Sequence, residues 1–582
     1  MVKRRDAMRI GLGAAASGAL ARTASAQAVI PQTGLVFPDG YTPGFLANPS
    51  PPATPFVMPL NVMPVARPVP ESAINPPPDP SAHQRYNEFP PKKFYIQNIS
   101  EFKWLYHKEG PYGNGSWAYG FNGITPGETF HAWYGEPIFV RRPNHLPPVG
   151  TGNIGWALPS YAIHLHNAHT ASESDGYPGD FADPGEFWDH HYPNIESGFD
   201  PRNRLSTLWY HDHRLDFTAP NVYAGLSAFY LLFDEKDSNN ERDKRRGAFR
   251  LPSGKYDVPL LLHDIWFDQN GQPGWDFVNP RPIASSEVSR GGYLPGPTYT
   301  NNGMLGDRFT VNRIIQPYFQ VERRKYRFRL LNGGPSRFYH ITLSTTKSDA
   351  EPFYVLSNDG NLLPEPILVE SLEIWDANRY DMIVDLSKYN AGDQIFLTNW
   401  LEMRPDGAGE TGRMLKTPNQ IMRFDVVGPK VEDPSRIPDF MRALPPIDMS
   451  QVKRHRLWNF DYVNGLWTIN GRLMDPNRID AAIEQGSAEI WTLRNNGDAW
   501  SHPIHSHFEE FQILEINGQK VKPGSINWSR KDVVQLGPMT SVTFYGHWRD
   551  FLGKYVMHCH NVVHEDHAMM LRWDIVPPGQ GY

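Results

Sequence analysis

Short runs in which apolar and polar residues alternate recur along the chain and predict strands rather than helices. The clearest is residues 325–331, Lys-Tyr-Arg-Phe-Arg-Leu-Leu, where every second side chain can face a core. The apolar run at 228–233 predicts a further strand, and no long stretch shows the spacing of an amphipathic helix. The 54 Pro and 49 Gly favour short strands joined by many turns. The pattern therefore predicts an all-β protein.

Breaks in this pattern divide the chain into three successive all-β units of sandwich type. Charged or Pro-containing stretches at 234–246 and 428–449 are expected to be linkers or solvated loops between them. A length of 582 residues agrees with this division, since domains average roughly 150 residues. Residues 29–91 are rich in Pro and predict an extended arm on the surface. We place the three units at residues 92–240, 250–430 and 450–582.

The first 28 residues have the order of a signal peptide. Lys3, Arg4 and Arg5 precede an apolar run at 10–20 and an Ala-Ser-Ala cleavage signal at 24–26. The paired arginines indicate the twin-arginine route and a periplasmic or extracellular location. The alternative is a frayed basic tail. The apolar run is too short to span a bilayer, so we expect no stable membrane insertion after the signal is removed.

Composition narrows the class of partner. Hydrophobic residues make up 40% of the chain and charged residues 20%, which is typical of a globular protein. The formal charge of −7 leaves no basic surface for nucleic acid, so we expect no nucleic-acid partner. A single cysteine, Cys559, excludes an intramolecular disulfide framework.

Four clusters of histidine carry the candidate chemistry. On a strand, alternate residues face the same side, so a His-x-His pair projects two imidazoles toward one point. Any one pair could be an accident among 22 histidines, but three such pairs and a His-Cys-His on one chain leave little room for accident. The clusters contain His164 and His166, His211 and His213, His502, His505 and His507, and His558, His560 and His564.

Cys559 lies between His558 and His560 and would face the opposite side of a strand from both. One short segment can thus ligate two metal sites back to back. A thiolate with two imidazoles and a weak axial thioether is the ligand set of a copper electron-transfer centre. Met569 is the candidate thioether, since its five-residue spacing from His564 is favoured over that of Met570.

The four clusters resemble the four copper-binding motifs of the multicopper oxidases. The resemblance is nearest to bacterial spore-coat-type laccases, with phenoxazinone synthase and bilirubin oxidase as near relatives. The sequences at 173–178, 221–226 and 379–381 support it, and it covers most of the chain after the N-terminal arm. It implies three consecutive cupredoxin-like domains, each a Greek-key β-sandwich or barrel. It also implies four copper ions: one of type 1, one of type 2 and two of type 3.

The resemblance assigns a ligand set to each copper. The type 1 ion takes His502, Cys559 and His564, with Met569 axial, and the type 2 ion takes His164 and His505. These clusters lie in the first and third units, so the type 2 and type 3 ions are expected at the interface of those units. The middle unit would be a spacer without copper. The type 3 pair takes His166, His211, His213, His507, His558 and His560.

The resemblance further implies a laccase-like oxidase. It would couple four one-electron oxidations of phenolic, aminophenolic or related small aromatic substrates to reduction of dioxygen to water. Electrons are expected to enter at a surface-accessible edge of His564 or His502. A metal-ion oxidase for Mn(II) or Cu(I) stays open as an alternative, and so does a copper-binding protein without turnover.

Two carboxylates and one departure from the family pattern complete the expectations. Dioxygen reduction consumes protons, and the resemblance makes Asp175 and Glu565 the candidate acids. The competing interpretations are a solvated loop carboxylate for Asp175 and an ordinary salt-bridge partner for Glu565. Asn167 stands where the family usually has Gly. It could alter a tight backbone turn or place an amide near the copper cluster.

Overall fold

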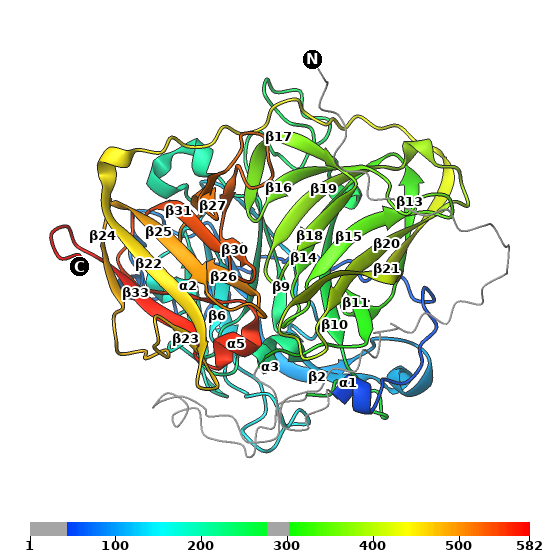
Figure 1. The fold of residues 1–582 in the computed structure, drawn as a ribbon, viewed down its shortest axis with the longest axis horizontal. Helices are drawn as coiled ribbons and strands as arrows, with labels where there is room; N and C mark the ends of the chain where they lie inside the picture. The colour runs from blue at the N-terminus through cyan, green and yellow to red at the C-terminus, as the bar shows by residue number, and fades with distance from the viewer. Residues whose placement is uncertain (1–43, 276–301) are drawn as a thin grey trace.

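The structure is a computed structural model that describes residues 44–275 and 302–582 (Figure 1). The expected signal peptide, 1–28, and the start of the Pro-rich arm lie outside the described residues. No helix in the described ranges is long and apolar enough to cross a bilayer. From residue 48 to 91 the arm forms isolated bridges to two units, including Pro59 with Tyr318 and Val65 with Thr129. A short helix, α1 (Gly44–Ala47), precedes it.

The first unit has its strands in three sheets. They are ordered β4-β9-β8-β6, β1-β5-β7 and β2-β3. Its helices are α2 (Ser172–Asp175) and α3 (Thr218–Ala224). Its strands are β1 (Lys93–Ile96), β2 (Ile99–Trp104), β3 (Ser116–Phe121), β4 (Phe130–Trp133), β5 (Ile138–Pro143), β6 (Ile163–His166), β7 (Phe187–Tyr192), β8 (Thr207–Asp212) and β9 (Ser227–Phe233).

The middle unit is a sandwich of two sheets, which Figure 1 shows in green to yellow. The sheets are ordered β12-β11-β10-β14-β19-β16-β17 and β13-β21-β20-β15-β18. Its strands are β10 (Asp257–Ile265), β11 (Arg308–Val311), β12 (Ile314–Ile315), β13 (Tyr318–Arg323), β14 (Lys325–Asn332), β15 (Tyr339–Ser344), β16 (Phe353–Asn358), β17 (Asn361–Val369), β18 (Ser371–Ile374), β19 (Arg379–Asp385), β20 (Gln394–Met403) and β21 (Glu410–Lys430).

The third unit repeats this plan. Its sheets are ordered β23-β22-β25-β31-β27-β28, with β29 beside β27, and β24-β33-β32-β26-β30. One helix, α5 (Val562–Asp566), follows β32. The strands are β22 (Val452–Val463), β23 (Leu466–Ile469), β24 (Ala481–Glu484), β25 (Ala488–Asn495), β26 (His502–Ser506), β27 (Phe511–Ile516), β28 (Gln519–Lys520), β29 (Arg530–Lys531), β30 (Val533–Leu536), β31 (Ser541–His547), β32 (Gly553–Cys559) and β33 (Met570–Val576).

The three units share a pattern of parallel pairs in otherwise antiparallel sheets. The first strand of each pairs in parallel with a later one: β1 with β5, β10 with β14, and β22 with β25. The last strand of each also has a parallel partner: β9 with β4, β21 with β13, and β33 with β24. A parallel neighbour needs a crossover rather than a hairpin. The repeated crossovers confirm the predicted all-β class and indicate one architecture used three times.

Each unit has its own apolar core, and two smaller apolar clusters with members from all three units lie where the units meet. The helices α3 and α5 lie side by side where the first and third units meet (Figure 1). The main-chain N–H groups of Thr218 and Ala219, in α3, donate to the carboxylate of Asp566 in α5 at 2.9 and 2.8 Å. This contact fixes the end of β32 against the first unit, where the histidines of both units converge.

Candidate metal centres

Strand register explains how the histidine pairs come together. In the first unit β6 runs antiparallel to β8 with His164 opposite His211. In the third unit β26 runs antiparallel to β32 with His505 opposite His558. Side chains of directly opposite residues point to the same face of a sheet. Each of the two units therefore carries two His-x-His pairs with their imidazoles on one face. These two faces lie opposite one another at the interface of the units.

One candidate site contains Cys559 and two imidazoles. The Cys559 Sγ lies 3.5 Å from His502 Nδ1 and 3.6 Å from His564 Nδ1, and the two nitrogens are 3.2 Å apart. All three side chains are buried. A thiolate and two imidazole nitrogens in one triangle match a trigonal copper site. We call these three residues the thiolate site.

The two candidate axial methionines lie in different surroundings. Met569 is buried in the same apolar cluster as Cys559, and its carbonyl oxygen accepts from the Cys559 N–H at 3.1 Å. Met570 packs instead with Tyr177 and Val556 in a separate cluster. The assignment of Met569 rather than Met570 as the axial ligand stays a prediction.

The second candidate site is a cluster of eight buried histidines, which we call the histidine cluster. Ring nitrogens that face one another are 3.4 Å apart for His164 Nε2 and His505 Nε2, and also for His166 Nδ1 and His211 Nε2. In a third set, Nε2 atoms are 3.0, 3.2 and 3.3 Å apart. That set is His213, His507 and His558. The eighth member, His560, lies with its ring centroid 5.3 Å from that of His166 and 5.2 Å from that of His211.

The outer nitrogens of these rings are held by oxygen acceptors. His164 Nδ1 donates to the Asp175 carbonyl at 2.5 Å, and His211 Nδ1 donates to the Asp212 carbonyl at 2.7 Å. His505 Nδ1 donates to the Asp532 carbonyl at 2.8 Å. Because a carbonyl can only accept, each of these rings carries its proton on Nδ1 and turns the lone pair of Nε2 inward. This is how proteins orient a metal-ligating imidazole.

The two predicted acids touch the histidine cluster. An Asp175 carboxylate oxygen, Oδ2, accepts from His507 Nδ1 at 2.7 Å, and its other oxygen has no hydrogen-bond partner among the described residues. The Glu565 carboxylate lies 3.1 Å from His213 Nδ1 and 2.8 Å from His558 Nδ1. Neither carboxylate is solvated, because both are buried.

Their surroundings move the two pKa values in opposite directions. Burial raises the pKa of Asp175 well above its ordinary value. Burial would also raise the pKa of Glu565, but attraction to His558 and His213 outweighs it and holds that pKa well below its ordinary value. Burial therefore favours the protonated form of Asp175, whereas the two imidazoles favour the ionised form of Glu565.

Sequence reasoning missed Asp532, which contacts the histidine cluster from behind. Its Oδ1 accepts from His166 Nε2 at 2.9 Å. The same carboxylate accepts two bonds from the Arg379 guanidinium, at 2.6 and 2.5 Å, and all three side chains are buried. His166 is thereby protonated on Nε2, so Nδ1 is the nitrogen that faces the cluster. The segment 379–381 had been noted only as part of the family resemblance.

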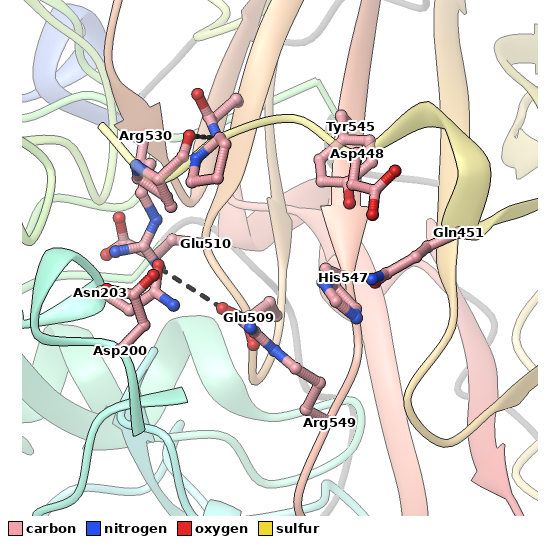
Figure 2. A pocket seen from close by; sticks show the side chains of 13 residues that line it. Asp200, Asn203, Asp448, Gln451, Glu509, Glu510, Arg530, Tyr545, His547 and Arg549 are labelled. Carbon is pink, nitrogen blue, oxygen red and sulfur yellow. Dashed lines mark hydrogen bonds and ion pairs between the residues drawn. The ribbon is translucent and has the colours of Figure 1, made fainter. Parts of the chain in front are cut away.

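A polar cavity of about 200 Å³ lies where the first unit, the segment 445–451 and the third unit meet (Figure 2). Glu509 and Arg530 form an ion pair across its wall at 3.3 Å. Glu510 also lines it, and burial together with the Asp532 carboxylate raises the pKa of Glu510 well above its ordinary value. The cavity reaches the charged groups behind the histidine cluster, and no predicted ligand is among its lining residues.

Asn167 adopts a backbone conformation that is more usual for Gly. Its φ is +61°, in the left-handed region, where Asn is tolerated better than most side chains. The side chain is buried, and neither polar atom of the amide has a hydrogen-bond partner among the described residues. Asn167 therefore occupies a left-handed turn and places a buried amide in the first unit.

The expected surface-accessible edge at the thiolate site is absent. His564 is 0% exposed and His502 is 1% exposed. His564 Nε2 donates to the Asn302 carbonyl at 2.6 Å, and the Trp467 indole stacks on its ring with centroids 3.9 Å apart. The expectation was wrong because these covering residues come from segments distant in sequence.

The donor set fits copper. Burial lowers the pKa of His502 and of His211 to about 3, which leaves neutral imidazoles that can ligate a metal. Burial raises the pKa of the Cys559 thiol, so a bound cation is what would hold it as a thiolate. Both ring nitrogens of His560 lack a hydrogen-bond partner in the described ranges, although the ring is buried. Buried polar atoms are normally paired. A bound metal would supply the missing partner of one of these two nitrogens.

Comparison with known sequences agrees with the donor set. The family model described as multicopper oxidase matches residues 446–579. The bilirubin oxidase of Albifimbria verrucaria is 33% identical over 475 residues, which cover 80% of this chain and 74% of that protein. The laccase of Bacillus subtilis (strain 168) is 29% identical over 529 residues, covering 84% of this chain and 95% of that protein.

Solved structures confirm the fold. A laccase from Pediococcus acidilactici Pa5930 superposes with a TM-score of 0.70 at 21% identity, covering 90% of this chain and 95% of that one. The McoA multicopper oxidase 2F4 variant from Aquifex aeolicus gives 0.69 at 22% identity, covering 89% and 99%. At these identities the likeness concerns the fold alone, and it confirms the predicted cupredoxin-like architecture.

Proposed function

Since the chain belongs to the multicopper oxidases, copper-dependent oxidoreductases that use dioxygen as acceptor, we propose that it is a laccase-like enzyme. It couples four one-electron oxidations of phenolic, aminophenolic or related aromatic substrates to the reduction of dioxygen to water. One observation carries the proposal: the thiolate site and the histidine cluster are both complete, and the segment His558-Cys559-His560 belongs to both. A copper-binding protein without turnover would not need both.

We assign the ligands as follows. His502, Cys559 and His564 would hold the type 1 ion, with Met569 axial, and His164 and His505 the type 2 ion. When bound, the four coppers would accept single electrons at the thiolate site and deliver four to dioxygen in the histidine cluster. The type 3 pair would be held by His166, His211 and His560 on one side and His213, His507 and His558 on the other.

The chain's own residues connect and protect the two sites. The Cys559 side chain faces the thiolate site while the backbone on either side carries imidazoles of the histidine cluster, so a few covalent bonds join them. Burial of every ligand excludes bulk water from both sites. Asp175 would hold a proton on its carboxyl group, beside His507. Glu565, ionised between His213 and His558, would take up protons as charge accumulates.

Support for an aromatic substrate comes from the surroundings of the thiolate site. The rings nearest His502 and His564 are those of Trp467 and Phe460. No carboxylate of the described residues forms an ion pair with His502 or His564. A site that oxidised Mn(II) or Cu(I) would need acidic or thioether ligands to hold the ion. Relatives named laccase and bilirubin oxidase support the same class of donor.

Oxygen uptake tests the proposal. The copper-loaded protein would be supplied in turn with an aminophenol, a methoxyphenol, bilirubin, Mn(II) and Cu(I). We expect uptake with the aromatic donors, four donor electrons consumed per dioxygen, and no accumulated hydrogen peroxide. Uptake with the metal ions alone would favour the metal-ion oxidase, and peroxide as the product would contradict reduction to water.

We further propose that the chain is exported by the twin-arginine route, which carries folded proteins and would suit an enzyme loaded with copper before export. The support is the order of charged, apolar and small residues in 1–28. Changing Arg4→Lys together with Arg5→Lys should hold the protein inside a bacterial host that has this pathway. Export of the double variant at the normal level would contradict the route.

A further inference from the structure

Both imidazoles of the thiolate site are buried, so a reducing substrate at the surface cannot touch either of them. If electrons reach this site from outside, other groups must carry them through the covering layer. Part of the layer over His564 is the hairpin of β22 and β23. Its composition therefore decides where substrate oxidation takes place.

Two aromatic side chains of this hairpin connect the surface to His564. Tyr462 and Trp467 are directly opposite in the register of β22 and β23, which brings their side chains to one face. Their ring centroids are 4.4 Å apart. Trp467 then stacks on His564 with centroids 3.9 Å apart and planes inclined by 30°. Tyr462 is 36% exposed and Trp467 is 0% exposed. The pair thus spans from solvent to a copper ligand with no gap.

A third ring, that of Trp500, lies beside the surface end of this pair. Trp500 is half-buried and lies 5.0 Å from Tyr462 and 5.5 Å from Trp467, between ring centroids. It precedes His502 by two residues, and Trp467 also lies 5.4 Å from the His502 ring. The three rings therefore form one group, which contacts both histidines through Trp467. We call Tyr462, Trp467 and Trp500 the aromatic bridge.

We propose that reducing substrates dock on the exposed face of Tyr462 and pass their electrons through the aromatic bridge to the thiolate site. This inference rests on the proposed function. Each event removes one electron from the donor, whose phenolic proton goes to solvent, and places that electron on the type 1 copper. The rings of the bridge are unchanged at the end of each event. Four events supply the four electrons that one dioxygen takes.

This route predicts what kind of donor the enzyme accepts. An electron-rich aromatic ring can stack on Tyr462 in the offset or edge-to-face geometry that aromatic pairs prefer. The donor need not enter a cavity, so large or polymeric phenols should serve as well as small ones. A hydrated metal cation has no ring to stack and would gain little from this surface.

The test measures reduction of the thiolate site without oxygen. Copper-loaded protein is mixed anaerobically with excess methoxyphenol, and the bleaching of the thiolate-to-copper band gives a second-order rate constant. Tyr462→Leu removes the outer ring, whereas Tyr462→Phe keeps the ring and removes only the hydroxyl. Trp528→Leu is the matched control, because Trp528 is 37% exposed in the same unit and has no ring contact with these histidines among the described residues.

We expect Tyr462→Leu to lower the rate constant about tenfold, the factor that corresponds to the loss of one aromatic stacking contact. Tyr462→Phe should restore most of the rate, and Trp528→Leu should match the unsubstituted protein. Copper content, the band's position and the reduction potential should be the same in all four proteins, since none of the changes touches a ligand. If Tyr462 had only a structural role, replacing it would change the copper content, the band's position or the reduction potential together with the rate constant.

Failure of the aromatic bridge and failure of the proposed function give different results in this experiment. If aromatic donors bleach the unsubstituted protein and Tyr462→Leu at the same rate, the aromatic bridge is wrong and the proposed function stands. An equal loss in Trp528→Leu would also overturn the bridge, since the effect would then be general. If no aromatic donor bleaches the unsubstituted protein, the proposed function fails and the inference falls with it.

Discussion

The sharpest prediction concerns Asp532, which the structure places between a buried guanidinium and a ligand of the histidine cluster. In Asp532→Asn the shape is kept, but the negative charge is lost. Arg379 then loses its bidentate partner but keeps Asp359, 4.0 Å away, two carbonyl acceptors and the electrostatic influence of Glu510. Removing one partner of a buried ion pair costs about 3–5 kcal/mol. Because these acceptors remain, we expect the variant to lose about 3 kcal/mol of stability, the lower end of that range.

Copper retention should fall as well, for a separate reason. His166 Nε2 now donates to a carboxylate, and in the variant it would donate to a neutral amide oxygen. Hydrogen bonds to ions are about twice as strong as neutral ones, a difference of about 1 kcal/mol. Partners of metal-ligating imidazoles change metal affinity by about 10–100-fold. Because Asp532→Asn keeps an acceptor, we expect the copper affinity to fall by the lower value, about tenfold.

Asp381→Asn is the matched control for this variant. Asp381 is buried and pairs with Arg327, with a 3.0 Å bond from Nε, but it has no contact with the histidine cluster in the described part of the chain. Both variants should therefore lose similar stability in calorimetry. Only Asp532→Asn should release copper about tenfold more readily to a competing chelator. Equal copper retention in the two variants would refute the assigned role of Asp532.

The remaining predictions concern residues identified from the sequence. Cys559→Ser replaces a soft thiolate with a hard hydroxyl, so absorption spectra should lose the intense visible band and oxygen uptake should stop while the fold is kept; uptake near the normal rate would contradict the electron route. Met569→Leu removes a weak electron donor and should raise the potential of the type 1 site in a redox titration; an unchanged or lower potential would speak against the axial assignment. Asp175→Asn and Glu565→Gln remove exchangeable acids. After anaerobic reduction and rapid mixing with oxygen, both should reoxidise slowly, with type 1 reduction nearly intact; normal reoxidation at full copper content would make these carboxylates structural.

The sequence predicts which histidines share a face of a strand, because that part of the arrangement depends on local geometry. Alternation on a strand fixes which side chains share a face, so His558 and His560 could be separated from Cys559 without a structure. The all-β class followed from the same alternation. Met569 could be preferred over Met570 by spacing alone, and packing places the two in different clusters.

Contacts between distant segments could not be predicted in this way. Asp532 reaches His166 from a position 366 residues further along the chain, and no local pattern marks it. The cover over His564 comes from Trp467 and from the carbonyl of Asn302, which lies in another unit. The sequence could not say whether Asn167 takes the left-handed conformation that is usual for Gly, and its φ of +61° shows that it does. Burial and second partners depend on how whole units pack, which periodicity does not encode.

Copper stoichiometry combined with spectroscopy tests whether the chain holds both metal centres. We expect four coppers per chain after loading, an intense visible band from the Cys559 thiolate, and paramagnetic resonance signals from two coppers only, since the type 3 pair would be coupled. A protein that takes up about one copper, or that shows no thiolate-to-copper band, would contradict the assignment of the thiolate site and the histidine cluster.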